Sequence, residues 1–264
     1  MVERRLTGMI AAAAVLLILL AMWDAFRPER RPAAPLESTV LVTAPPAAPS
    51  SSSQGTAAPA TDGPRGPGEP TYIDLLARSE TRRRIRATTG TYLNEMLAAS
   101  RDSMLRRWDD RNTTPVRVWF APTYAANFRP AFLDAIRAAF AQWGAAGVPV
   151  RFDLNADSAD AEVVFRWKIQ YEIERTGQTD LTWDQDGRIE SAVVTLATFD
   201  PKGRPMEPDD IRVVALHEVG HLLGLDHSTD TTDIMFPTAK VRELSDRDVR
   251  TVLFLYQLPP GSLR

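Results

Sequence analysis

The three histidines of this chain all lie in one short stretch, HEVGHLLGLDH, from His217 to His227. The surrounding segment PDDIRVVALHEVGHLLG predicts a helix, because it opens with Pro and Asp and closes at a glycine. On that helix His217 and His221 are four residues apart, so they share one face and can hold one ion. Gly224 can take the left-handed conformation that ends a helix and turns the chain back. Such a turn carries His227 to the same ion as a third ligand.

Three neutral imidazoles suit zinc and leave a fourth coordination position open for water, which is the layout of a catalytic site. Glu218 stands next to the first ligand and is placed to reach that water without ligating. The alternative is that these are ordinary helix histidines, since a bare HExxH pattern recurs by chance. Here five fixed positions match and no histidine is left elsewhere in the chain. We therefore predict one catalytic zinc ion with His217, His221 and His227 as ligands and Glu218 as the catalytic residue.

Composition excludes several other classes of site and partner. The chain has no cysteine, so disulfides, thiolate zinc sites and a cysteine nucleophile are ruled out. A formal net charge of -3 indicates no nucleic-acid partner. We expect a monomer that acts on a protein or peptide substrate.

Residues 1–27 are predicted to be a membrane anchor or a signal segment. The run Leu6–Trp23 carries no charge and follows Arg4 and Arg5. It is at the lower limit for spanning a bilayer and slightly long for a signal-peptide core, and no convincing small-residue cleavage site follows it. We favour an uncleaved anchor that holds the catalytic domain outside the cytoplasm; a cleaved signal and secretion is the alternative. Arginines flank both ends, so the positive-inside rule does not decide the orientation.

Two further segments are expected before the catalytic domain. Residues 28–70 hold ten of the twenty prolines, with Ala, Ser and Gly between them, and predict a disordered linker. Residues 71–112 predict a helical extension in two pieces that part near Gly90. In the second piece, apolar residues recur at helical spacing: Leu93, Leu97, Met104, Leu105 and Trp108. The arginine run Arg82–Arg86 suggests either an anionic partner or a solvated helix face, and we favour the face.

Residues 113–264 alternate between strand and helix patterns, which predicts an α+β domain. Strands are expected at PVRVWF (Pro115–Phe120), VRFDLN and AEVVFRW. Apolar residues mark one face of a helix that ends at Gly147: Phe128, Phe132, Ile136, Phe140 and Trp143. The segment LSDRDVRTVLFLY predicts a last helix, with Ser245 and Asp248 in capping positions.

The stretch GQTDLTWDQDGRIESAVVTLAT predicts a β-hairpin that turns at Asp186-Gly187. Its second arm, Ser191–Thr198, is the more apolar one and is expected to be the inner strand. The polar first arm, Gly177–Asp184, is then expected at the sheet edge. An edge strand exposes unpaired N–H and C=O groups to which a substrate peptide can add as another strand.

The positions His217, Glu218, His221, Gly224 and His227 reproduce the HExxHxxGxxH motif, and here the chain resembles the metzincin zinc endopeptidases. Ser228, directly after the third ligand, resembles the matrixin branch (peptidase M10 type), and the strand segment GRIESAVVTLA is similar to bacterial matrixin-like proteins. The resemblance covers roughly residues 115–256. It implies a mixed, twisted β-sheet, an active-site helix and a C-terminal helix, and places Met235 of DIMFP in a Met-turn under the metal. It also implies a metalloendopeptidase that uses zinc-activated water, with Glu218 as general base.

The chain departs from animal matrixins in two respects. It has no further histidines for their second, structural zinc, and no cysteine for their propeptide latency, so any latency mechanism must differ. Calcium stays unassigned: the acidic runs DLNADSAD and DQDG are candidates, but solvated turns are favoured. Two other functions remain as alternatives. One is an inactive zinc-binding or interaction module on the same fold, which the presence of Glu218 argues against. The other is a gluzincin-type hydrolase, which the complete Gly224 and His227 pattern argues against.

Overall fold

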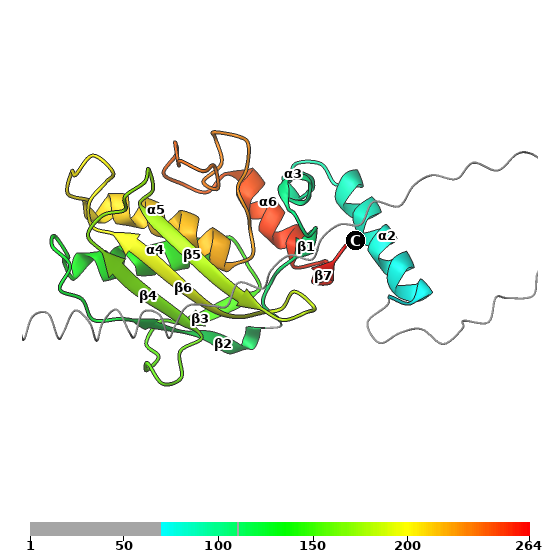
Figure 1. Cartoon of the computed structure of the whole chain (residues 1–264), viewed down its shortest axis with the longest axis horizontal. Coiled ribbons are helices and arrows are strands. Elements are labelled where there is room, and N and C mark those ends of the chain that lie inside the picture. Colours follow the sequence, from blue (N-terminus) through cyan, green and yellow to red (C-terminus); the bar gives the residue numbers. More distant parts are fainter. Residues whose placement is uncertain (1–69, 110) are drawn as a thin grey trace, which may run out of the picture. The chain divides into compact units, whose positions relative to one another are not determined.

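A computed structural model describes residues 70–109 and 111–264 of the chain. Its centre is a five-stranded mixed sheet with helices packed on one face (Figure 1). The strands are β2 (Arg111–Phe120), β3 (Val150–Asp153), β4 (Val163–Lys168), β5 (Gly177–Trp183) and β6 (Ile189–Ala197), in the order β3-β2-β4-β6-β5. This arrangement agrees with the α+β class expected from the sequence.

The hairpin prediction is confirmed. β5 and β6 are antiparallel, and Gly187 in the turn between them has a φ of +77°. A positive φ is readily adopted by glycine, which is why an Asp-Gly pair favours this turn. β5 lies at the edge and β6 lies inside the sheet, as the polarity of the two arms predicts. The other pairings, β2 with β3, β2 with β4 and β4 with β6, are all parallel.

Two long helices, α4 (Ala131–Ala145) and α5 (Pro208–Leu222), pack against each other on the same side of the sheet (Figure 1). Most of the predicted apolar face of α4 is buried, and Phe132, Ile136 and Trp143 are at most 1% exposed. Phe128 was expected on the same face, but it precedes the helix and is only partly buried. The Trp143 indole donates a hydrogen bond to the Leu216 carbonyl on α5 (2.9 Å). The buried face of α4 and this hydrogen bond hold α5 over the sheet and close to the edge strand.

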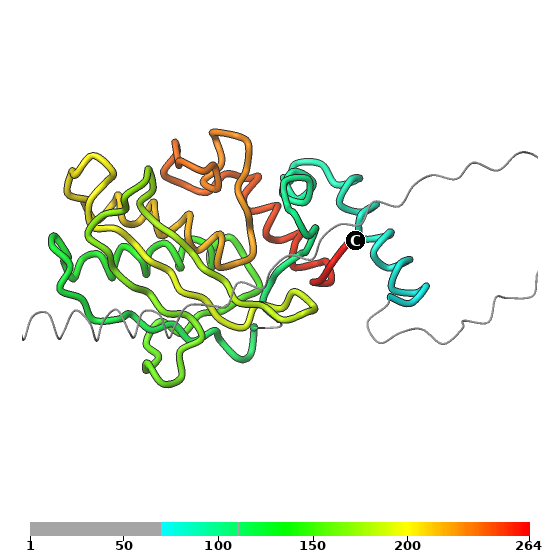
Figure 2. The backbone as a smooth tube through the Cα atoms, viewed as in Figure 1, coloured from blue at the N-terminus to red at the C-terminus, as the bar shows by residue number. Residues whose placement is uncertain are grey.

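The C-terminal helix α6 (Asp246–Leu255) begins as predicted. Ser245 and Asp248 form a capping box in which each side chain accepts a hydrogen bond from the other residue's backbone N–H (2.9 Å each). Between α5 and α6 runs a long connection, orange in Figure 2, which carries His227 and Met235.

The extension before the sheet differs in part from the prediction. It forms helices α2 (Tyr72–Ala87) and α3 (Leu93–Ala99), which part near Gly90 as expected. The expected helix over Met104 and Leu105 is wrong: these residues form the short strand β1, which pairs with β7 (Gly261–Ser262).

The helix stops because local side-chain hydrogen bonds compete with it. Ser100 Oγ accepts from the Ser103 backbone N–H (3.1 Å), and Asp102 Oδ1 accepts from the Met104 N–H (3.2 Å). Ser103 itself takes a positive φ of 51°. The apolar spacing beyond this point reflects burial in the core, since the Trp108 indole donates to the Leu222 carbonyl at the end of α5 (2.9 Å).

The predicted membrane segment (residues 1–27) and all but the last residue of the predicted linker (28–70) lie outside the described residues. The anchor and the extracytoplasmic location therefore stay predictions. Within residues 70–109 and 111–264, none of the helices has the length and apolar character needed to cross a membrane.

Candidate metal centre

Helix α5 carries the first two histidines on one face, next to the sheet. Pro208 occupies its first turn, and Glu207 and Asp210 form a capping box at its start. The Nε2 atoms of His217 and His221 lie 3.1 Å apart. The spacing of four residues thus brings the two rings together as the sequence predicts.

Gly224 follows the helix with a φ of +94° and reverses the chain. A Cβ at this position would lie 2.1 Å from the Arg106 carbonyl oxygen, so a side chain would collide with the backbone of the extension. The Leu225 N–H closes the turn on the Gly220 carbonyl (3.0 Å). The reversal brings His227 Nε2 to 3.2 Å from His221 Nε2, and ligand atoms of all three histidines lie within 4.8 Å of one another.

Backbone carbonyls orient two of the three rings. His217 Nδ1 lies 2.7 Å from the Ile234 oxygen, and His221 Nδ1 lies 2.8 Å from the Leu225 oxygen. A carbonyl only accepts, so each Nδ1 carries the proton and each Nε2 is left with a free lone pair. Metal-bound histidines are held in this way.

Two of the three ring separations are close to those around a tetrahedral ion. Two nitrogens bound at about 2.0–2.1 Å to one tetrahedral zinc ion lie roughly 3.3–3.4 Å apart. The Nε2 separations here are 3.1 and 3.2 Å. Because neither His217 nor His221 has a proton on Nε2, the contact between these two rings is two lone pairs facing one point rather than a hydrogen bond. The three histidines can therefore hold one metal ion.

Burial keeps the three histidines in the form that binds metal. It lowers the pKa of His217 to about 4 and that of His221 to about 3, because a charged imidazolium is poorly solvated there. The pKa of His227 is also lowered, again mainly by burial. All three rings are thus neutral near pH 7, which is the protonation state that a metal requires.

Glu218 belongs to helix α5, and its side chain packs against the edge strand β5; the residue is only 4% exposed. Its Oε2 accepts a hydrogen bond from the Thr179 hydroxyl (2.7 Å). At Gly177 a Cβ would lie 2.3 Å from Glu218 Oε1, so any side chain there would displace the carboxyl group. Strand β5 and Glu218 therefore meet directly, through a glycine and a hydroxyl.

The pKa of Glu218 is raised to about 7, chiefly because burial disfavours the carboxylate. The hydrogen bond from Thr179 and the charge of Arg175 oppose this rise, while Asp180 adds to it. A carboxyl group with a pKa near neutrality exchanges protons readily at pH 7, which suits a general base and acid. A cation held by the neighbouring histidines would lower this pKa and favour the carboxylate.

Met235 packs against helix α5 and is fully buried. A Cβ on Gly220 would lie 2.3 Å from its sulfur, so the absence of a side chain at Gly220 makes room for Met235. The Met235 carbonyl accepts from the Ser228 N–H (2.9 Å), which closes the connection between the third histidine and the methionine into a loop.

Sequence reasoning did not single out Gly177, Thr179 or Gly220. The signal for Gly220 lies in the motif itself, between the two helical histidines, where a small residue leaves space against the helix. Gly177 and Thr179 are two residues apart on β5 and therefore lie on the same face of the strand. The sequence predicts this once the orientation of the hairpin is known. That they face Glu218 depends on how α5 crosses the sheet.

The two acidic runs considered for calcium form turns. Asp184 Oδ1 accepts from the backbone N–H groups of Asp186 and Arg188 (2.9 and 2.8 Å), and Asp153 Oδ1 accepts from that of Asn155 (3.0 Å). These carboxylates stabilise their own turns in the way typical of Asp. Calcium remains unassigned.

Comparison with known proteins identifies a family over the part of the chain that carries these residues. Residues 108–257 match the family model described as Matrixin. The chain is 32% identical over 138 residues to Metalloendoproteinase 1-MMP of Arabidopsis thaliana, which covers 46% of this chain and 36% of that protein. It is 48% identical over 52 residues to macrophage metalloelastase of Oryctolagus cuniculus, which covers 18% of this chain and 11% of that protein. The chain thus spans little more than a third of the length of the first of these relatives, and less of the other.

Proposed function

The chain belongs to the matrixin family, and on that premise we propose that it is a zinc-dependent endopeptidase that hydrolyses peptide bonds in protein substrates. The observation that carries this proposal is the convergence of three histidine Nε2 atoms beside one buried carboxyl group, Glu218. A structural zinc site uses four protein ligands, whereas this cluster offers three and leaves a position for water. The relatives' names as metalloendoproteinases support the same reaction class.

In the proposed mechanism His217, His221 and His227 hold the zinc ion, and Glu218 moves the proton. Zinc bound there would polarise the scissile carbonyl and lower the pKa of water. Glu218 accepts a proton from the attacking water and returns it to the leaving amine. The Thr179 hydroxyl, bonded to Oε2, fixes the direction of the carboxyl group during both transfers. Since the nucleophile is water, no covalent enzyme intermediate is needed.

The substrate peptide is proposed to bind along the free edge of β5. The Ala197 N–H donates to the Thr176 carbonyl (2.8 Å), so these two residues form a hydrogen-bonded antiparallel pair. In the register of the hairpin, Asp180 is then also directed at β6, opposite Val193. Thr179 and Leu181 alternate with it and direct their backbone N–H and C=O groups away from β6. These outward groups are the ones available to a substrate strand.

Removal of the metal tests the proposed function. We expect the full-length protein to cleave an unstructured protein substrate such as casein, to lose this activity in a zinc chelator, and to regain it when one equivalent of zinc is added. The measurements are peptide release and bound zinc by elemental analysis. Activity that persists in protein freed of zinc would refute the zinc mechanism, and zinc binding without any cleavage would favour the inactive module.

The edge-strand assignment predicts the effect of Leu181→Pro. Proline removes one outward N–H and is tolerated on an edge strand when that N–H is not part of the ladder. We expect kcat/KM for a long peptide to fall by about 3- to 10-fold, the effect of one lost hydrogen bond, while zinc content is unchanged. Leu181→Ala is the matched control, since it shortens the same side chain and keeps the N–H. Equal kcat/KM in the two variants would show that the substrate does not pair at this position.

A further inference from the structure

Helix α3 of the extension is joined to the loop that follows the third histidine. The joining residues, Tyr92 at the start of α3 and Glu95 in its first turn, lie before the matched range 108–257. Tyr92 is fully buried, and its backbone N–H donates to the Thr251 hydroxyl on α6 (3.1 Å). The extension is therefore part of the packed structure around the loop 228–235.

One chain of hydrogen bonds runs from α3 to a histidine of the metal centre. The Tyr92 hydroxyl donates to Asp248 Oδ1 (3.1 Å), and Asp248 Oδ2 accepts from the Ile234 N–H (2.8 Å). The carbonyl of the same residue, Ile234, accepts from His217 Nδ1 (2.7 Å). The Ile234 N–H bond (2.8 Å) and the His217 bond (2.7 Å) have ordinary lengths, and the Tyr92 O–H···O contact (3.1 Å) is a long hydrogen bond.

The Tyr92 hydroxyl satisfies one oxygen of the buried Asp248 carboxyl group. Asp248 is fully buried, and Oδ2 is occupied by the N–H groups of Ile234 and Ser245 (2.8 and 2.9 Å). Oδ1 receives the Tyr92 hydroxyl. A buried carboxylate oxygen without a donor is strongly unfavourable, so loss of the phenol hydroxyl would make this carboxyl group shift or turn. Such a movement alters the Ile234 peptide that holds the His217 ring.

A second connection reaches the same loop from Glu95. Its Oε2 accepts from the Thr229 hydroxyl (2.6 Å), two residues after His227, and its Oε1 pairs with Arg247. Arg247 in turn donates to the buried Asp233 (3.1 Å). Both ends of the loop, near the third histidine and near Ile234, are thus tied to one short helix.

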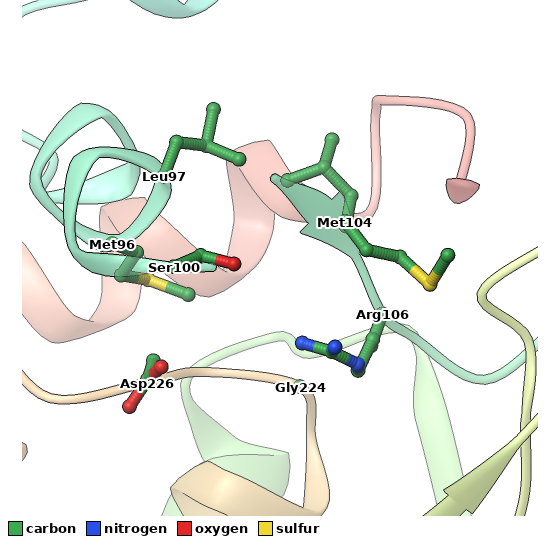
Figure 3. A pocket seen from close by; sticks show the side chains of 8 residues that line it. Met96, Leu97, Ser100, Met104, Arg106, Gly224 and Asp226 are labelled. Atoms are coloured by element: carbon green, nitrogen blue, oxygen red, sulfur yellow. The ribbon is translucent and has the colours of Figure 1, made fainter. Parts of the chain in front are cut away.

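A small cavity separates α3 from the turn at Gly224 (Figure 3). It measures about 30 Å³ and is lined on the α3 side by Met96 and Leu97 and on the other by Gly224 and Asp226. The hydrogen bonds of Tyr92 and Glu95 lie outside this cavity's lining and connect α3 to Asp248 and to the 228–235 loop.

We propose that Tyr92 and Glu95 are positioning residues of the metal centre: through Asp248 and Thr229 they hold the 228–235 loop so that His217 and His227 face the ion together. This inference rests on the proposed zinc site. On this proposal, α3 contributes to the geometry of the metal centre, although α3 precedes the region matched to the family.

Zinc affinity of the full-length protein tests the role of Tyr92. Tyr92→Phe removes the hydroxyl and keeps the ring. Loss of a direct hydrogen-bond partner of a ligand lowers metal affinity by 10- to 100-fold, so for a residue two links further away we expect the zinc Kd to rise by about 3- to 10-fold. The Kd is measured by competition with a chromophoric chelator. The visible spectrum of the cobalt-substituted variant should also change, because it reports ligand geometry.

The matched control is Tyr256→Phe. Its hydroxyl also donates a 3.1 Å hydrogen bond, but to the Leu223 carbonyl at the end of α5, outside the 228–235 loop. We expect it to lower the melting temperature of the metal-free protein as Tyr92→Phe does, with an unchanged zinc Kd and cobalt spectrum. Equal zinc Kd values for Tyr92→Phe and the parent would overturn the proposal, as would equal rises in both tyrosine variants.

Glu95→Gln provides a second test that does not depend on a core substitution. Glu95 is partly exposed, so this variant should fold, and its lost charge weakens the pairing with Arg247. We expect a smaller rise in zinc Kd, about 2- to 3-fold, because the amide still accepts from Thr229 and outer hydrogen-bond partners act weakly at this distance. An unchanged Kd would remove Glu95 from the proposal. If the parent protein itself bound no zinc, the proposed function would fail instead.

Discussion

Glu218→Gln is expected to lower kcat for peptide hydrolysis by about 10²- to 10⁴-fold, the usual contribution of a general base. The amide has nearly the same size and can still accept the Thr179 hydrogen bond, but it cannot take a proton from water. Zinc content should be unchanged, because Glu218 is not among the three converging ligands. The measurements are kcat on a fluorogenic peptide and bound zinc by elemental analysis.

The control for this variant is Glu190→Gln, which makes the same change at an exposed position on β6. It should leave kcat and zinc content at the parent values. Near-normal turnover in Glu218→Gln would exclude proton transfer by this residue. The roles of Arg175 and Asp180, whose charges also act on the Glu218 carboxyl group, would then be the next to test.

His227→Ala is expected to abolish cleavage and to weaken zinc binding by more than about 100-fold. Outer-shell partners alone change metal affinity by 10- to 100-fold, so removal of a ligand should exceed that range. The fold should persist, because His227 is the most accessible of the three histidines and lies after helix α5. The zinc Kd from chelator competition and the thermal stability of the metal-free protein measure the two effects separately.

Thr231→Ala, an exposed position in the same loop, is the control for His227→Ala and should bind zinc as the parent does. Full zinc occupancy of the His227 variant would mean that another group completes the site. Within the described residues, no second cluster of His, Asp and Glu side chains has ligand atoms placed to hold an ion.

Local signals in the sequence predicted many elements correctly because those elements are stabilised by near neighbours. The Asp186-Gly187 turn needs only a glycine with positive φ, and the alternation of β5 and β6 follows from one polar and one apolar arm. The capping box of Ser245 and Asp248 is likewise complete within four residues. The pairing of His217 with His221 depends only on helical periodicity.

The same local signals failed between α3 and the sheet. Met104 and Leu105 continue an apolar period, yet they form a strand with residues 261 and 262 at the other end of the chain. Periodicity reports which residues are buried, and it does not tell a helix from an irregular segment that is buried by distant partners. The order β3-β2-β4-β6-β5, with its parallel crossovers, likewise depends on connections that no short stretch encodes.

The sequence by itself determined the chemistry of the site: three histidines and one glutamate at spacings that a helix and a glycine turn bring to one point. Tertiary structure alone decided what surrounds them. The contact of Thr179 with Glu218 joins residues 39 positions apart, and the contact of Tyr92 with Asp248 joins residues 156 positions apart. Such contacts arise only when the sheet, α5 and α6 have packed, because burial of their apolar faces sets the distances between residues that the chain does not connect.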